Sequence, residues 1–261
     1  MKKALLWVLA FLITLAAAVF QRMTGPSYPL SGRTVVDGET VAFRLDRSAL
    51  TARDMDITLK VPAKRISGYV RWKRFKSDDL PYAMALERRG DELFAALPRQ
   101  PMAGKLEYRV FLQDVSLTGD KPVVVRFRGS VPGWLLIPHI LVMFLAMLFS
   151  SRAGLAELDG REKTRPLVLW TLALLFLGGF ILGPLVQKFS FGVLWSGFPL
   201  GFDLTDNKTL IAFAVWAGAA IAGRGGRKAR GWIIAAAAVT LAVYLIPHSL
   251  LGSELKVDRP K

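Results

Sequence analysis

Five apolar stretches divide the chain, and one long segment between the first two has a mixed pattern. The stretches cover residues 4–20, 134–149, 167–186, 210–222 and 232–251. An α-helix needs about 20 predominantly apolar residues to cross the hydrocarbon core of a bilayer. The pattern therefore predicts an N-terminal helix over residues 1–20 and an all-α domain of four transmembrane helices over residues 134–251.

The first apolar stretch allows two interpretations. Lys2 and Lys3 precede about 17 apolar residues, which is the lower limit for a membrane-spanning helix. This length favours a retained anchor, whereas a cleavable signal peptide would use the small residues Ala16 and Ala18 as its cleavage site. Both interpretations place the following segment outside the cytoplasm.

Residues 21–133 have the alternating pattern of short β-strands. Residues 34–45 predict a hairpin that turns at Asp37 and Gly38, and residues 82–97 predict a second hairpin that turns at residues 89–91. Further strands are expected at residues 56–61, 66–75, 105–113 and 122–127. About seven or eight short strands at this spacing are typical of a β-sandwich. The fold class is therefore mixed, with an all-β immunoglobulin-like sandwich domain and an all-α transmembrane bundle.

One part of this segment resembles a known family. Leu97 and Pro98, followed by residues 104–110 with Tyr108 among them, resemble the tyrosine-corner region of immunoglobulin-like and fibronectin type III domains. The chain as a whole resembles bacterial polytopic membrane proteins that carry a small outer β domain. These resemblances imply a fold and no activity.

Charge and composition predict the membrane topology. The 261-residue chain has a formal net charge of +15 and a mean hydropathy of +0.37. Basic residues gather at residues 150–166 and 224–230, and the positive-inside rule places such short loops in the cytoplasm. The β domain, an aromatic loop at residues 187–208 and a tail at residues 252–261 then lie outside. We expect a multi-pass protein of the bacterial inner membrane that contacts lipid and no nucleic acid.

Residues 69–75 interleave aromatic and basic side chains. Such a pattern is typical of an ordinary strand, with Val70 and Trp72 inward and Arg71 and Lys73 in solvent. The alternative is a surface for polyanions or lipid headgroups. The ordinary strand is favoured because a period of two alone produces this pattern.

Few routes to catalysis are open to this sequence. The chain contains no cysteine, which excludes disulfides, thiolate metal sites and cysteine nucleophiles. It has no phosphate-binding glycine loop, no HExxH motif and no nucleophile elbow. We therefore do not expect an enzyme, and no catalytic residue is assigned.

The two histidines of the chain follow the same three residues. Residues 136–139 and 245–248 both read Leu-Ile-Pro-His. His139 lies about 8 Å along a helix from Trp134, and His248 lies about 24 Å along a helix from Trp232. Because the two helices run in opposite directions, both imidazoles are expected near the outer face. Two separate interfacial histidines are the alternative to a shared ligand site.

The aromatic loop ends in a polar cluster that could complete such a site. Asp203, Asp206 and Asn207 offer oxygen ligands, which together with imidazole suit a divalent metal. One acid is also expected to cap the following helix, and we prefer Asp206 for that role. Trp195 and Lys208 belong to the same loop. The hypothesis is a haem b or divalent-metal site that uses His139, His248 and Asp203.

The part of the loop from Trp195 to Asp203 is similar to the tryptophan-rich outer loops of haem-handling cytochrome c assembly proteins, without their repeated tryptophans. Two functions follow from the sequence. The first is an integral membrane accessory or binding protein, whose outer β domain docks other membrane subunits. The alternative is a haem- or metal-binding membrane protein for electron transfer or cofactor handling.

Overall fold

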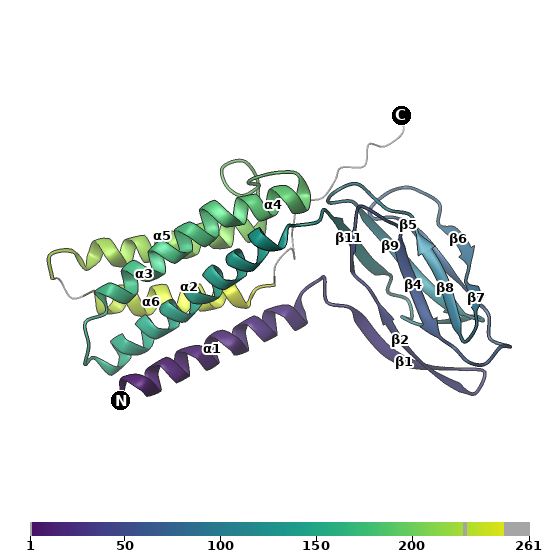
Figure 1. The fold of residues 1–261 in the computed structure, drawn as a ribbon, viewed down its shortest axis with the longest axis horizontal. Coiled ribbons are helices and arrows are strands. Elements are labelled where there is room, and N and C mark those ends of the chain that lie inside the picture. Colours follow the sequence, from purple (N-terminus) through teal and green to yellow (C-terminus); the bar gives the residue numbers. More distant parts are fainter. Residues whose placement is uncertain (1, 227–228, 248–261) are drawn as a thin grey trace. The chain divides into compact units, whose positions relative to one another are not determined.

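The chain folds into two compact units in a computed structural model that describes residues 2–226 and 229–247 (Figure 1). Residues 27–130 form a β unit. The described residues before and after them, 2–26 and 131–247 without 227–228, form a helical unit. Three helical stretches are long and apolar enough to cross a membrane: Lys3–Thr24, Gly133–Asp159 and Arg165–Phe191. The chain therefore combines β-sheets with helices suited to a membrane.

The β unit contains three sheets. The first is the hairpin of β1 (Leu30–Val36) and β2 (Glu39–Leu45). The second has the order β3-β11-β9-β5-β6, with β10 paired to β9, and contains β3 (Ser48–Leu50), β5 (Gly68–Arg74), β6 (Tyr82–Ala85), β9 (Lys105–Leu112), β10 (Val115–Ser116) and β11 (Val123–Arg128). The third has the order β4-β8-β7, from β4 (Met55–Lys60), β7 (Glu87–Arg89) and β8 (Glu92–Leu97).

The first predicted hairpin is confirmed, and the second is wrong in part. Asp37 and Gly38 have φ values of 50° and 78°, as the tight turn between β1 and β2 requires. The second hairpin exists only between β7 and β8, around Gly90. Strand β6 pairs with β5 instead. The sheets also contain more strands than predicted, because β3, β7 and β10 are too short to leave a period in the sequence.

The β unit has a single hydrophobic core. Alternate residues of β4, β8, β9 and β11 are buried in it, and Val70 of β5 joins them. Tyr108 is buried in this core, and its hydroxyl donates to the carbonyl of Asp46 at 2.7 Å. Burial raises the pKa of this phenol. In a tyrosine corner the acceptor lies a few residues upstream of the tyrosine. Asp46 lies 62 residues upstream of Tyr108, so this hydrogen bond is not that of a tyrosine corner.

The helical unit consists of α1 (Lys3–Thr24), α2 (Gly133–Asp159), α3 (Arg165–Leu175), α4 (Gly183–Phe191), α5 (Leu204–Ala222) and α6 (Arg230–Leu245). A π-helical segment, Phe176–Leu182, joins α3 to α4. Helix α2 packs against α1, α3 and α6, and α5 packs against α3 and α6. Three of the described helical stretches meet the length and apolarity that a membrane crossing needs, where four plus an N-terminal helix were predicted. Helix α5 begins with charged residues, and α6 has only 16 residues.

Several predicted boundaries are also wrong. Helix α2 continues ten residues beyond Phe149, through most of the predicted cytoplasmic loop, and ends before Gly160 at φ 71°. Helix α4 extends to Phe191, so the aromatic loop is irregular only over residues 192–203. Pro247 lies beyond the end of α6 and not inside the helix. Hydropathy alone misplaced these boundaries for two reasons. Polar and aromatic residues continue α2 and α4 beyond their apolar stretches, and the apolar stretch at α6 continues beyond the end of the helix.

Candidate functional site

A cavity of about 540 Å³ lies within the helical unit. Its walls come from α1, α2, the Arg165–Phe191 stretch, α5 and the end of α6. The lining residues on α2 run from Leu136 to Met147, which corresponds to about 16 Å along the helix. The cavity is therefore elongated along the direction in which these helices run.

The two ends of the cavity differ in chemistry. The charged lining residues and most of the polar ones are Gln21, Arg22, His139, Gln187, Ser190, Asp203, Thr205, Asp206 and Lys208. They lie at the ends of α1 and α4 and at the starts of α2 and α5, so they share one end of the bundle. Farther along the same helices the lining is mainly apolar, with Met143, Phe144, Met147, Leu175 and Ala212. The hydroxyls of Thr14 and Tyr244 in this part donate to the backbone carbonyls of Ala10 and Met143. The arrangement suits a molecule with a polar head and an apolar body.

His139 enters this cavity with its ring fixed by the backbone. Its Nδ1 lies 3.1 Å from the carbonyl oxygen of Gly178, in the π-helical segment. A carbonyl only accepts, so Nδ1 carries the hydrogen, and Nε2 of the neutral ring keeps its lone pair. Gly178 also accepts from the N–H of Gly183. The π-helical turn thus brings this carbonyl within reach of the imidazole.

Asp206 and Asn207 hold the irregular loop against the start of α5. The Asp206 carboxylate accepts from the N–H of Ser196 at 2.6 Å and from the N–H of Gly197 at 3.0 Å. Asn207 accepts from the N–H of Phe198 at 2.7 Å. A side chain added at Gly197 would come within 2.6 Å of Asp206 Cβ. These residues therefore hold the loop in place beside the start of α5.

The capping role falls to Asp203 and not to Asp206. Asp203 is the residue before α5, and its carboxylate accepts from the N–H of Thr205 at 2.8 Å. Asp206 lies one turn later and is used by the loop. The prediction exchanged these two acids because either spacing suits an N-cap. Asp203 remains a lining residue of the cavity.

Lys208 is a buried cation, only 5% exposed, and its structural partner was missed by sequence reasoning. Its ammonium group donates to the carbonyl of Ile246, just beyond the end of α6. Gln21 of α1 donates to the carbonyls of Tyr244 and Ile246. A cation at a helix C-terminus is favourable because the last carbonyls lack helical partners. Lys208 and Gln21 thus tie three helices together beside the cavity.

The remaining predicted site residues lie apart or outside the described chain. Trp195 stacks on Phe180 with ring centroids 5.6 Å apart, and its indole donates to the carbonyl of Phe198. His248 lies outside the described residues. Within residues 2–226 and 229–247 there is no group of three histidine, aspartate or glutamate residues placed to hold a metal. His139 and Asp203 share the cavity wall.

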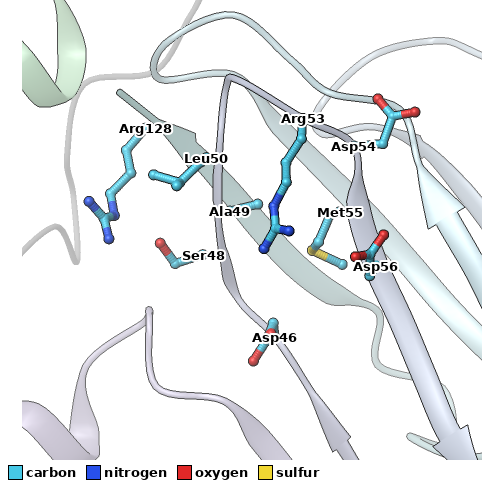
Figure 2. A pocket seen from close by; sticks show the side chains of 9 residues that line it. All are labelled: Asp46, Ser48, Ala49, Leu50, Arg53, Asp54, Met55, Asp56 and Arg128. Carbon is cyan, nitrogen blue, oxygen red and sulfur yellow. The ribbon is translucent and has the colours of Figure 1, made fainter. Parts of the chain in front are cut away.

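The β unit has a second, smaller pocket of about 180 Å³. Figure 2 shows the nine side chains that line it, among them Arg53, Arg128 and three aspartates. One of the aspartates, Asp54, accepts from the backbone N–H of Arg99 at 2.9 Å. The carbonyl of Asp46 accepts from Tyr108. These two groups form hydrogen bonds that hold the β unit together near the ends of its strands. The larger cavity is therefore the better candidate for a functional site.

Comparison of the chain with family models, with curated proteins and with solved structures gave no match.

Proposed function

We propose that the chain is an integral membrane binding protein whose helical unit holds an amphiphilic molecule in the cavity. The single observation that carries this proposal is the gradient of polarity along the 540 Å³ cavity. The polar end contains Lys208, Asp206 and Gln187, which can hydrogen-bond a headgroup. Apolar side chains of α2 would contact a hydrocarbon body. The polar end is the end at which α1 and α2 lead to the β unit, which supports a site near the outer membrane face.

A pair of neighbouring residues on α2 gives a matched test. Ile140 lines the cavity and is 55% exposed, whereas Leu141 does not line it and is 57% exposed. We expect wild-type protein to co-purify with an amphiphile that solvent extraction and mass spectrometry identify. The Ile140→Trp variant should lose this molecule because the indole fills the mouth of the cavity. The Leu141→Trp variant should retain it, and equal loss in both variants would contradict the proposal.

A haem or metal function is the second candidate, and the fixed imidazole of His139 favours it. Metal-ligating histidines commonly donate their other ring nitrogen to a backbone carbonyl, as His139 does to Gly178. His248 and Asp203 would supply further ligands in this proposal. Protein expressed with haem and metals supplied should then show a visible spectrum or a stoichiometric metal. His139→Leu should abolish that signal, and a colourless, metal-free wild type would refute this function.

We also propose that the β unit is an immunoglobulin-like sandwich that serves as an outer docking module. The orders β3-β11-β9-β5-β6 and β4-β8-β7 place non-consecutive strands side by side, as Greek-key connections do. Strands from both sheets contribute to one core. Such domains commonly recognise partners, and this one would dock the other subunits of a membrane complex. Isolation of the full chain with a stable partner subunit would support the accessory role.

The proposed location is the bacterial inner membrane, with the β unit outside the cytoplasm. The basic residues Arg161 and Arg165 flank the end of α2 and the start of α3, and Arg224 and Arg230 flank α5 and α6. The positive-inside rule assigns both connections to the cytoplasm. Reporter fusions after Gly160 and Gly226 should therefore score as cytoplasmic. An external signal at either position would reverse the proposed topology.

A further inference from the structure

The outward side of β5, β9 and β11 carries an excess of positive charge. We call this surface the basic face, and it consists of Arg71, Lys73, Lys105, Arg109, Arg126 and Arg128. These residues alternate along their strands with the core residues of the β unit. Glu107 is the acidic residue on the same side of these three strands, and its carboxylate lies 3.4 Å from Lys73. On these three strands the face thus presents six basic side chains and one carboxylate.

Two like-charged pairs stand directly opposite each other across the strands. Arg71 of β5 is in register with Arg109 of β9. Lys105 of β9 is in register with Arg126 of β11. Like charges at directly opposite positions destabilise a sheet. The two juxtapositions concentrate positive charge on this side of the sheet, and an anionic partner would reduce the repulsion between the opposed cations.

Aromatic rings support the arginines of the face. Tyr69 and Phe111 stack with centroids 4.8 Å apart, and the Arg71 guanidinium lies 5.6 Å from the centroid of each ring. Arg109 lies 5.1 Å from the ring of Phe111. Its side chain also contacts the carbonyl of Gly119 and lies 3.7 Å from the exposed carboxylate of Asp120. The rings hold the two guanidinium groups near the sheet without neutralising them.

We infer that the basic face binds an anionic phospholipid surface. Guanidinium groups suit phosphate because their planar donors bond two oxygens at once. A lipid surface is the anion array always within reach, since α1 and α2 connect to the β unit through segments 25–29 and 129–132. Such segments extend by at most about 20 Å. The inference rests on the proposed outer docking role of the β unit, and it is independent of any cavity ligand.

The test uses the full chain in nanodiscs of phosphatidylcholine. Its binding is measured by flotation with vesicles of phosphatidylcholine alone and with vesicles that also contain phosphatidylglycerol. We expect binding only to the second vesicles, and we expect added salt to weaken it. The double variant Arg71→Gln/Arg109→Gln should bind about 25-fold more weakly, since each cation near an anionic bilayer contributes about a fivefold gain. Circular dichroism of each variant checks that its β-sheet content is unchanged.

Arg33 and Arg44 provide the matched control. They are exposed on the β1–β2 hairpin, outside the basic face, so Arg33→Gln/Arg44→Gln removes the same charge. This control should bind like the wild type. Equal loss in both double variants, or wild-type binding to a soluble anionic polysaccharide but not to phosphatidylglycerol vesicles, would overturn the inference. If solvent extraction of the purified chain yields no amphiphile but the chain still binds phosphatidylglycerol vesicles, the proposed cavity function is wrong and this inference stands.

Discussion

The guanidinium carbon of Arg152 on α2 lies 5.3 Å from the ring centroid of Trp7 on α1. Arg152 is 1% exposed and donates to Glu162, and its Nε and Nη1 have no hydrogen-bond partner among the described residues. A buried charge without full pairing is costly. The aromatic ring of Trp7 therefore stabilises the buried guanidinium group of Arg152, which has too few hydrogen-bond partners.

This contact predicts that α1 stays with the protein. Trp7→Ala should lower the unfolding free energy of the detergent-solubilised chain by about 2 kcal/mol. The substitution removes a desolvated cation–π contact and exposes the Arg152 guanidinium group. Leu12→Ala, at an exposed position of the same helix, should have little effect. The intact mass of the purified chain should include Lys3–Thr24. A mature chain that begins after Ala18 and retains its stability would contradict the prediction.

A buried hydrogen bond joins α5 to α6. The indole of Trp216 donates to the hydroxyl of Thr240 at 2.8 Å, and both side chains are fully buried. Thr240→Val keeps the shape and leaves the indole N–H without its partner. We expect a loss of about 1 kcal/mol in unfolding free energy. Thr24→Val at an exposed position is the control, and equal effects of the two substitutions would argue against a specific role for the bond.

The loop over residues 192–203 should depend on Asp206 more than on Asp203. Asp206→Ala removes the acceptor of the Ser196 and Gly197 amides, and hydrogen exchange at both should become faster by about tenfold or more. Asp203→Ala should affect mainly the amide of Thr205. Unchanged exchange at Ser196 in the Asp206 variant would show that the loop is held by other contacts.

A pH-dependent contribution to stability is expected in the β unit. Arg74 donates to both oxygens of Asp79, at 2.6 and 2.7 Å, which lowers the pKa of this carboxyl to about 2. Because the folded pKa lies below the unfolded one, the stabilisation is present above about pH 4 and is lost as the pH falls through about 2. Asp79→Asn should therefore destabilise the β unit at neutral pH, and its difference from wild type should shrink on acidification. Asp114→Asn is the exposed control, and a difference that grew below pH 4 would contradict the assignment.

Sequence alone determined the features that depend on local pattern. Alternation placed β4, β5, β9 and β11 within one or two residues of their positions, and the Asp37–Gly38 turn followed from the backbone conformation it requires. Hydropathy located the three long apolar helices, because a bilayer selects length and apolarity with little regard to neighbours.

Tertiary structure decided what depends on residues far apart in the chain. Lys208 and Asp206 looked like loop residues, and only packing against α6 and the irregular loop gave them partners at Ile246 and Ser196. The pairing of Arg71 with Arg109 likewise needs the register of two strands. The cavity arises where five helical segments meet, so no single stretch encodes it. Periodicity reports which way a side chain faces, whereas its partner is fixed by the packing of distant segments.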